Sequence, residues 1–449
     1  MNVVLLSTYE LGRQPFGLAS PAAWLRRAGA EVTRADLSRQ PLPGDAVRAA
    51  DLIAFYVPMH TATRLAARTL PLIRQLNPNA HLCFYGLYAP MNEAYLRGLG
   101  AQTILGGEFE DGLVSLVERL RAGRAAQVEP TVSLPRLQFL LPDRSQLPPL
   151  KRYARLQVNG RERVVGYTEA SRGCKHLCRH CPIVPVYNGV FRIVQPDVVL
   201  ADIRQQVAAG AEHITFGDPD FFNGPGHALE IVEALHLEFP QLTYDVTIKI
   251  EHLLKHSQHL ARLRATGCLF VTSAVESIDD AVLARLAKGH TRADFLEVAR
   301  RFRAVGLTLA PTFVPFTPWT RLEDYLELLN LIAELELIDN VAPIQLAIRL
   351  LIPSGSKLLE LAEVAALVGE FDPASLVYPW RHADPRVDAL QRAVQEAVHA
   401  AEHRGEPRSR IFDTIWTLAH DAAGRPAHPV SAPRLARAAI PYLNEPWYC

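Results

Sequence analysis

Three cysteines in one short segment are the residues of this sequence best suited to chemistry. Cys174, Cys178 and Cys181 lie within eight positions of one another, and the other three cysteines stand far from them. Six cysteines in 449 residues are too few for a disulfide scaffold, so clustered thiols indicate metal or redox chemistry. Three thiolates on an iron–sulfur cubane leave one iron open, as a reactive metal site requires. The segment therefore predicts a reactive [4Fe-4S] centre.

Two other uses of these thiols remain open from the residues alone. A zinc ion would take the three cysteines and either His176 or His180. Zinc modules usually pair two knuckles, and this chain has no second one. A non-enzymatic electron-transfer cluster is the other alternative, but such a cluster is normally ligated by four protein side chains.

The cysteine segment follows a predicted strand, and strands alternate with helices on both sides of it. Before residue 127, apolar runs at 2–7, 52–57, 81–85 and 103–105 alternate with amphipathic stretches. This alternation predicts a doubly wound, flavodoxin-like parallel sheet whose ligand lies beyond the carboxyl ends of the strands. After residue 160 about six further βα units fit, and the last expected strand is at 344–351. A full eight-stranded barrel takes about 250 residues, so this span predicts a partial (βα)6 barrel.

The domain boundaries follow from these patterns. We expect a doubly wound domain at 1–127, a barrel at 161–371 and a helical C-terminal region at 372–449. Prolines accumulate after residue 128, which predicts a linker at 128–160. The cysteine segment then lies at the catalytic mouth of the barrel.

Charge and composition exclude several classes of function. Lys and Arg number 47 and so do Asp and Glu, and no long run of like charge occurs, which argues against a nucleic-acid or anionic-membrane surface. The hydrophobic fraction of 49% is that of a packed globular protein. The N-terminal apolar run is too short for a signal peptide or a membrane span, so we expect a cytoplasmic protein.

The Cys-x3-Cys-x2-Cys loop after the first barrel strand resembles that of the radical S-adenosylmethionine (SAM) superfamily. The resemblance implies that the cluster's open iron binds the amino and carboxylate groups of SAM. One electron from an external flavodoxin- or ferredoxin-type donor then cleaves SAM to methionine and a 5'-deoxyadenosyl radical. The segments 215–223, 270–277 and 288–291 resemble further motifs of the superfamily.

These motifs supply the candidate SAM-binding residues. The resemblance implies this role for Asp218, Asp220, Glu276 and Ser277, although two aspartates beside a proline also commonly cap a turn. Glu276 ends an apolar strand, so its charge should meet a ligand or a cation. Arg349 lies in an apolar run and is a fifth candidate, to hold a carboxylate of SAM or substrate; an internal acidic partner is the equal alternative.

The N-terminal domain resembles the cobalamin-binding domain that precedes many radical SAM barrels, through the segments 84–90 and 106–110. It lacks an Asp-x-His-x-x-Gly motif, so the resemblance implies cobalamin without that histidine ligand. The same glycines would serve a flavin-binding or an empty domain equally well. The candidate cobalamin-binding residues are Thr8, Tyr9, Tyr56, His60, Thr61, Gly86, Leu87, Gly106, Glu108 and Glu110.

A second resemblance covers nearly the whole chain. The segments 7–12, 15–21, 178–182 and 315–319 are similar to those of radical SAM proteins with a Cys-Sec-Ala-Glu-Pro or Cys-Cys-Ala-Glu-Pro tail. The sequence ends at Cys449, where that motif would begin. Either the motif is lost, or a selenocysteine codon was read as a stop, or Cys449 is an ordinary terminal thiol.

Together these patterns predict a radical SAM transferase for cobalamin-assisted methylation or alkylation of a small molecule. The alternative is a radical SAM enzyme with a degenerate cobalamin domain that transfers another SAM fragment to a soft acceptor.

Overall fold

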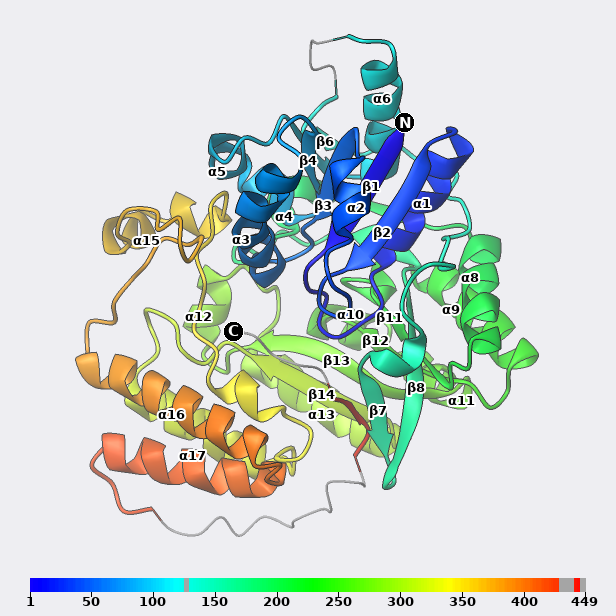
Figure 1. The fold of residues 1–449 in the computed structure, drawn as a ribbon. Helices are drawn as coiled ribbons and strands as arrows, with labels where there is room; N and C mark the ends of the chain where they lie inside the picture. The colour runs from blue at the N-terminus through cyan, green and yellow to red at the C-terminus, as the bar shows by residue number, and fades with distance from the viewer. Residues whose placement is uncertain (125–128, 428–439, 445–449) are drawn as a thin grey trace.

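Two sheets organise the chain, one in the N-terminal third and one after residue 150 (Figure 1). The computed structural model describes residues 1–124, 129–427 and 440–444. Strands and helices alternate through both parts, and this confirms the predicted α/β class.

The N-terminal sheet has six parallel strands in the order β2-β1-β3-β4-β5-β6. Its strands are β1 (Asn2–Ser7), β2 (Glu31–Asp36), β3 (Leu52–Tyr56), β4 (His81–Tyr85), β5 (Thr103–Gly107) and β6 (Val132–Ser133). Its helices are α1 (Phe16–Arg27), α2 (Gly44–Arg48), α3 (His60–Leu76), α4 (Tyr88–Met91), α5 (Glu93–Gly98) and α6 (Phe109–Arg121).

Successive residues of these strands point to opposite faces, and both faces are apolar. Leu5 packs with α1 and α6 on one face, whereas Leu6 packs with α3 and α5 on the other. Helices therefore cover both sides of the sheet, as the doubly wound prediction requires. The sequence patterns missed β2, because it alternates polar and apolar residues at the edge of the sheet.

The second sheet has seven strands in the order β14-β13-β12-β11-β8-β7-β15 and forms the partial barrel. Five are parallel: β8 (Arg161–Thr168), β11 (His213–Phe216), β12 (Thr243–Thr247), β13 (Cys268–Glu276) and β14 (Thr308–Phe313). The last two strands, β7 (Arg155–Val158) and β15 (Tyr442–Leu443), are antiparallel to their neighbours, and β15 forms one edge.

One predicted barrel strand does not form. The apolar run at 344–351 folds as a short 3-10 helix, Pro343–Leu346, and then makes a single isolated bridge between Phe316 and Arg349. Most apolar residues of this run pack in the core without pairing in a strand ladder. A short apolar run has the same pattern in both cases, so the sequence could not tell a strand from such a segment. Conversely, the unpredicted β7 joins β8 through Asn159 and Gly160, both at positive φ, which is a typical hairpin turn.

The remaining helices cover the outer face of the barrel and its far end. Those of the barrel are α7 (Val184–Tyr187), α8 (Pro196–Ala208), α9 (Pro225–Glu238), α10 (Ile250–Lys255), α11 (Leu260–Ala265), α12 (Asp280–Arg285), α13 (Arg292–Val305) and α14 (Leu322–Glu334). After them come α15 (Ala362–Leu367), α16 (Pro385–His403) and α17 (Arg408–Ala422), and the last two lie side by side (Figure 1). Within the described ranges, no helix is long and apolar enough to cross a membrane.

Candidate functional site

A two-stranded ribbon holds the base of the cysteine loop. β9 (Ser171–Gly173) pairs with β10 (Phe191–Ile193) in antiparallel fashion, so the loop leaves and returns at one place. Gly173 has a φ of 75°, and a Cβ there would lie 2.4 Å from a ring carbon of Tyr187. Only glycine fits this turn, and it delivers Cys174 directly after the ribbon.

The three thiols are largely shielded from water. Burial, with a smaller contribution from neighbouring cysteine thiolates, raises the pKa of Cys174 to about 11 and that of Cys181 to about 12. Lys288 is the cation beside them, and it lowers the pKa of Cys181. Cys174 and Cys181 are therefore poor thiolates by themselves, and a bound metal centre removes that penalty. The donor set therefore fits an iron–sulfur cluster.

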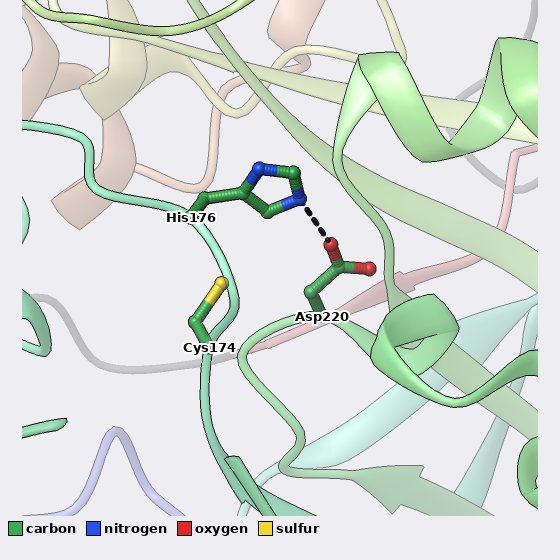
Figure 2. Close-up of side chains that lie close together, drawn as sticks. All are labelled: Cys174, His176 and Asp220. Carbon is green, nitrogen blue, oxygen red and sulfur yellow. Dashed lines mark ion pairs between the residues drawn. The ribbon is translucent and has the colours of Figure 1, made fainter. Parts of the chain in front are cut away.

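A second donor group overlaps this one. A ligand atom of Cys174, one of His176 and one of Asp220 lie within 4.8 Å of one another, as Figure 2 shows. His176 Nε2 is 3.5 Å from Asp220 Oδ2, and Lys249 Nζ is 3.0 Å from His176 Nδ1. A metal ion at this group would use one cysteine and not the three of the zinc alternative, and Cys174 cannot serve it and the cluster independently.

Asp218, one of the predicted SAM-binding residues, braces the base of the loop. Its carboxylate accepts hydrogen bonds from the Ala170 amide at 2.9 Å and from the Ser171 hydroxyl at 2.5 Å. Burial raises its pKa to about 7. These contacts reach across 47 and 48 positions of the chain, so they are not the turn cap that the sequence left as the alternative.

Asp220 links three segments at the same mouth. Its Oδ1 accepts from the Phe222 amide at 3.1 Å, and its Oδ2 lies 2.7 Å from His252 Nδ1. Burial raises the pKa of Asp220, but His176 and His252 outweigh this and hold it below the usual value. Sequence patterns missed His252, because it reaches the site from α10 with no motif of its own.

Glu276 meets cations, as its position in an apolar strand predicts. Its Oε1 accepts from His180 Nε2 at 3.0 Å and from Lys288 Nζ at 3.3 Å. Burial raises its pKa, yet Lys288 and His180 lower it to about 2, so the carboxylate stays charged. Ser277 follows in a turn and accepts from the Asp279 amide. The loop's His180 and the motif residue Lys288 thus converge on one carboxylate.

Arg349 is occupied elsewhere. Its guanidinium donates to Asp388 at 2.5 Å and to the Trp380 carbonyl at 2.6 Å, and it stacks over the Trp380 ring. The sequence left two partners open for Arg349, a carboxylate of SAM or substrate and an internal acidic residue. In the structure its partner is an internal acidic residue, Asp388. Its role toward SAM remains a prediction without a supporting contact.

The predicted cobalamin-binding residues lie at the carboxyl edge of the N-terminal sheet, and several are buried in contacts within the protein. The Thr8 hydroxyl donates to the Ala62 carbonyl, and His60 Nε2 lies 2.5 Å from the Ser375 carbonyl. The buried Tyr56 fills the space beside Gly17 and Gly86. Tyr9 and Gly106 are also buried, and Thr61 and Leu87 are partly exposed.

Glu108 and Glu110 pair with a residue that sequence patterns missed, Arg172, which lies two positions before Cys174. Its guanidinium is 2.7 Å from Glu110, 3.2 Å from Glu108 and 2.7 Å from Glu169. It also lies near the rings of three phenylalanines, Phe16, Phe109 and Phe139. We call Arg172 with the three glutamates the Arg172 cluster. It joins the N-terminal domain to the base of the cysteine loop.

The cavity described at this edge of the N-terminal sheet is small. A cavity of about 150 Å³ lies beside Gly106, Glu108 and Ser133. Sites for whole cofactors and drug-sized ligands usually measure about 300–1,000 Å³. This cavity would hold a side group of cobalamin and not its macrocycle, so we derive no chemical step from that cofactor.

Known proteins resemble this chain in the region of the cysteine loop. Residues 168–332 match the family model described as the radical SAM superfamily. A tRNA-2-methylthio-N(6)-dimethylallyladenosine synthase of Bordetella petrii is 26% identical over 278 residues, which cover 58% of this chain and 54% of that protein. The corresponding synthase of Thermobifida fusca is 31% identical over 146 residues, covering 32% of this chain and 26% of that one. The chain thus matches about half the length of such curated relatives, or less.

Solved structures match more of the chain. The cobalamin-dependent SAM radical enzyme OxsB, with aqua-cobalamin and SAM bound, superposes with a TM-score of 0.72 at 14% identity, covering 94% of this chain and 72% of OxsB. The radical SAM methyltransferase TsrM of Kitasatospora setae, with tryptophan and a SAM analogue, gives a TM-score of 0.68 at 17% identity and 90% coverage of both chains. These TM-scores show that the chain shares its fold with both enzymes.

The family match gives the chain a radical SAM domain at residues 168–332. That domain implies a [4Fe-4S] cluster and SAM, and the chain as a whole shares its fold with OxsB and TsrM. The terminal Cys449, on which the second resemblance partly depends, lies outside the described residues.

Proposed function

We propose that this protein is a radical SAM enzyme in which Cys174, Cys178 and Cys181 hold the [4Fe-4S] cluster. The observation that carries the proposal is the convergence of strand-end carboxylates on the cysteine loop, with Asp220 beside His176 and Glu276 on His180. When bound, the cluster and SAM supply a one-electron cleavage of the sulfonium that yields a 5'-deoxyadenosyl radical.

The chain's own residues position this chemistry. Gly173 turns the loop, and Asp218 fixes the loop base through two hydrogen bonds. Lys288 places a positive charge beside the cysteines and is itself held by Glu276. Because Lys288 is buried, its charge acts in a medium where it is weakly screened, and it favours the anionic cluster.

For the reaction, we propose methylation or alkylation of a small molecule assisted by cobalamin. The support is the fold shared with OxsB and TsrM, which are named as cobalamin-dependent and as a methyltransferase respectively. Anaerobic assays with and without added cobalamin test this. Methylation should release 5'-deoxyadenosine and S-adenosylhomocysteine together, and full activity with no corrin spectrum would refute it.

A second candidate has its own supporting observation. Glu108 and Glu110 are fully buried and paired with Arg172, so the loop that would face cobalamin is engaged by the barrel instead. This favours a degenerate cobalamin domain and transfer of another SAM fragment to a soft acceptor. Release of methylthioadenosine in the same assay would identify aminocarboxypropyl transfer.

The cluster assignment is tested by cysteine replacement. Cys178→Ser in the anaerobically reconstituted protein should lose the cluster absorbance, bound iron and SAM cleavage. Cys268→Ser is the matched control, since Cys268 is equally buried but lies outside the loop. A cluster that survives in Cys178→Ser contradicts the assignment. Zinc in place of iron, lost in Asp220→Asn, would identify the mononuclear alternative.

A further inference from the structure

The inner face of the barrel sheet encloses a cavity of about 490 Å³, which we call the lumen cavity. Residues of β11, β12, β13 and β14 form its wall. Arg13, from the N-terminal domain, lies at its rim, and the corner between α16 and α17 closes another side together with β15. Its volume is within the range of small-molecule sites.

The lumen cavity is polar where a barrel interior is usually apolar. Along these strands the outward residues, such as Val246, Val271 and Leu309, pack in the main hydrophobic core. The inward positions carry hydroxyls instead, and Thr247 and Thr272 are paired neighbours on adjacent strands. Structural barrels fill this space with bulky branched side chains. Because polar groups without partners cost stability, this wall is suited to a hydrogen-bonding ligand.

Asp245 is the polar centre of this wall. It is 4% exposed, and its Oδ1 accepts from His213 Nε2 at 2.9 Å and from the Thr215 hydroxyl at 2.6 Å. Across the parts of the chain that the structure describes, no hydrogen bond reaches the second oxygen, Oδ2. Two fixed donors on one oxygen hold the carboxylate rigidly and leave the other oxygen available for a ligand.

The charges around the lumen cavity favour a cation. Four acidic residues and two arginines line it, but the Asp218 carboxyl group bonds the cysteine loop and Glu406 pairs with Arg404. Both arginines have contacts of their own. Arg13 lies over the Tyr167 ring, and Arg408 donates to the Asp339 carbonyl and lies over Tyr442. On the strand wall, the buried Asp245 is the carboxylate that would attract a cation.

The lumen cavity also adjoins the cysteine loop. Asp218 follows β11 and is one of the residues that line the cavity. Its carboxylate also accepts hydrogen bonds from Ala170 and Ser171 at the base of the cysteine loop. A molecule in the cavity therefore lies below the mouth where SAM cleavage is proposed.

We propose that the lumen cavity binds the substrate, and that this substrate is a small polar molecule with a protonated amine received by Asp245. The inference rests on the proposed radical SAM function, whose substrate class it specifies. The threonine hydroxyls of β12 and β13 would hydrogen-bond the polar groups that surround the amine.

Glucosamine and glucose form a matched pair of probes, because they differ only in one amino group. Binding is measured by calorimetry on the reconstituted full chain, at a pH where the amine is protonated. Glucosamine should bind and glucose should bind at least about tenfold more weakly, the size expected for a hydrogen bond to a charged group.

Two variants and a control locate the binding. Asp245→Asn should weaken glucosamine about ten- to a hundredfold and leave glucose unchanged. Thr247→Val, which keeps the carboxylate, should weaken glucosamine about two- to tenfold. Asp197→Asn removes one exposed charge on α8 and should change neither affinity. Unfolding midpoints show whether each variant remains folded.

Several results would overturn the inference. Equal binding of the two sugars, no glucosamine binding, or an unchanged affinity in both cavity variants would exclude an amine site at Asp245. Displacement of glucosamine by SAM would show that the cavity is part of the SAM site. If SAM cleavage proceeds in each of these cases, only the substrate inference fails. Glucosamine binding by a protein that forms no cluster would refute the proposed function and the substrate role together.

Discussion

Arg172 offers the sharpest test of how the two domains cooperate. Its guanidinium is 7% exposed and faces three carboxylates, of which Glu108 and Glu110 come from the other domain. Arg172→Met keeps much of the side-chain volume against the phenylalanine rings and removes the charge. Removal of one partner of a buried ion pair costs about 3–5 kcal/mol, since the remaining charges are left unpaired. We expect a loss of that size in the free energy of unfolding.

The assay is denaturant unfolding of the full chain, followed by iron content after reconstitution. Arg204→Met is the control, because its pair with Glu238 is exposed and should contribute less than about 1 kcal/mol. Since Arg172 lies next to the loop base, we also expect Arg172→Met to bind less iron than the control. An unfolding free energy and an iron content equal to those of Arg204→Met would refute the reasoning.

The pH dependence gives a second readout of the same cluster. Burial raises the pKa of Glu108 to about 7, against the lowering by Arg172. A raised pKa means that the folded state binds the proton more tightly, so stability from Glu108 is full below its unfolded pKa of about 4.5 and declines as pH rises to about 7. In Arg172→Met the charge that lowers the Glu108 pKa is gone, so this decline should continue to higher pH.

Three further predictions follow the same logic. The pKa of Glu276 is lowered to about 2, so its carboxylate contributes about 3 kcal/mol to the free energy of unfolding above pH 4.5, and this contribution is lost as pH falls toward 2. Acid unfolding of Glu276→Gln should lack this component. Gly173→Ala places a methyl group 2.4 Å from the Tyr187 ring and should abolish cluster binding, measured as iron content, while wild-type iron would contradict the turn. Arg349→Met should cost about 1 kcal/mol through its partly exposed pair with Asp388 and leave SAM cleavage unchanged, whereas lost cleavage would restore its SAM-binding role.

The sequence determined what short-range patterns can encode. Cysteine spacing specified a three-thiolate loop, and the alternation of strands and helices specified two α/β units around it. Glu276 in an apolar strand required a cation, and the structure provides Lys288. Each of these signals is carried by residues close together in the chain, so one sequence is enough to read them.

Tertiary structure alone decided the contacts between distant residues. Glu110 meets Arg172 across 62 positions, and His252 reaches Asp220 from a helix with no motif. The run at 344–351 lost its predicted strand because neighbouring elements satisfied its apolar side chains without a ladder. Which face of β12 carries Asp245 into the lumen is likewise a matter of strand register. Pairing and register are set by the packing of the whole sheet, and no local pattern contains them.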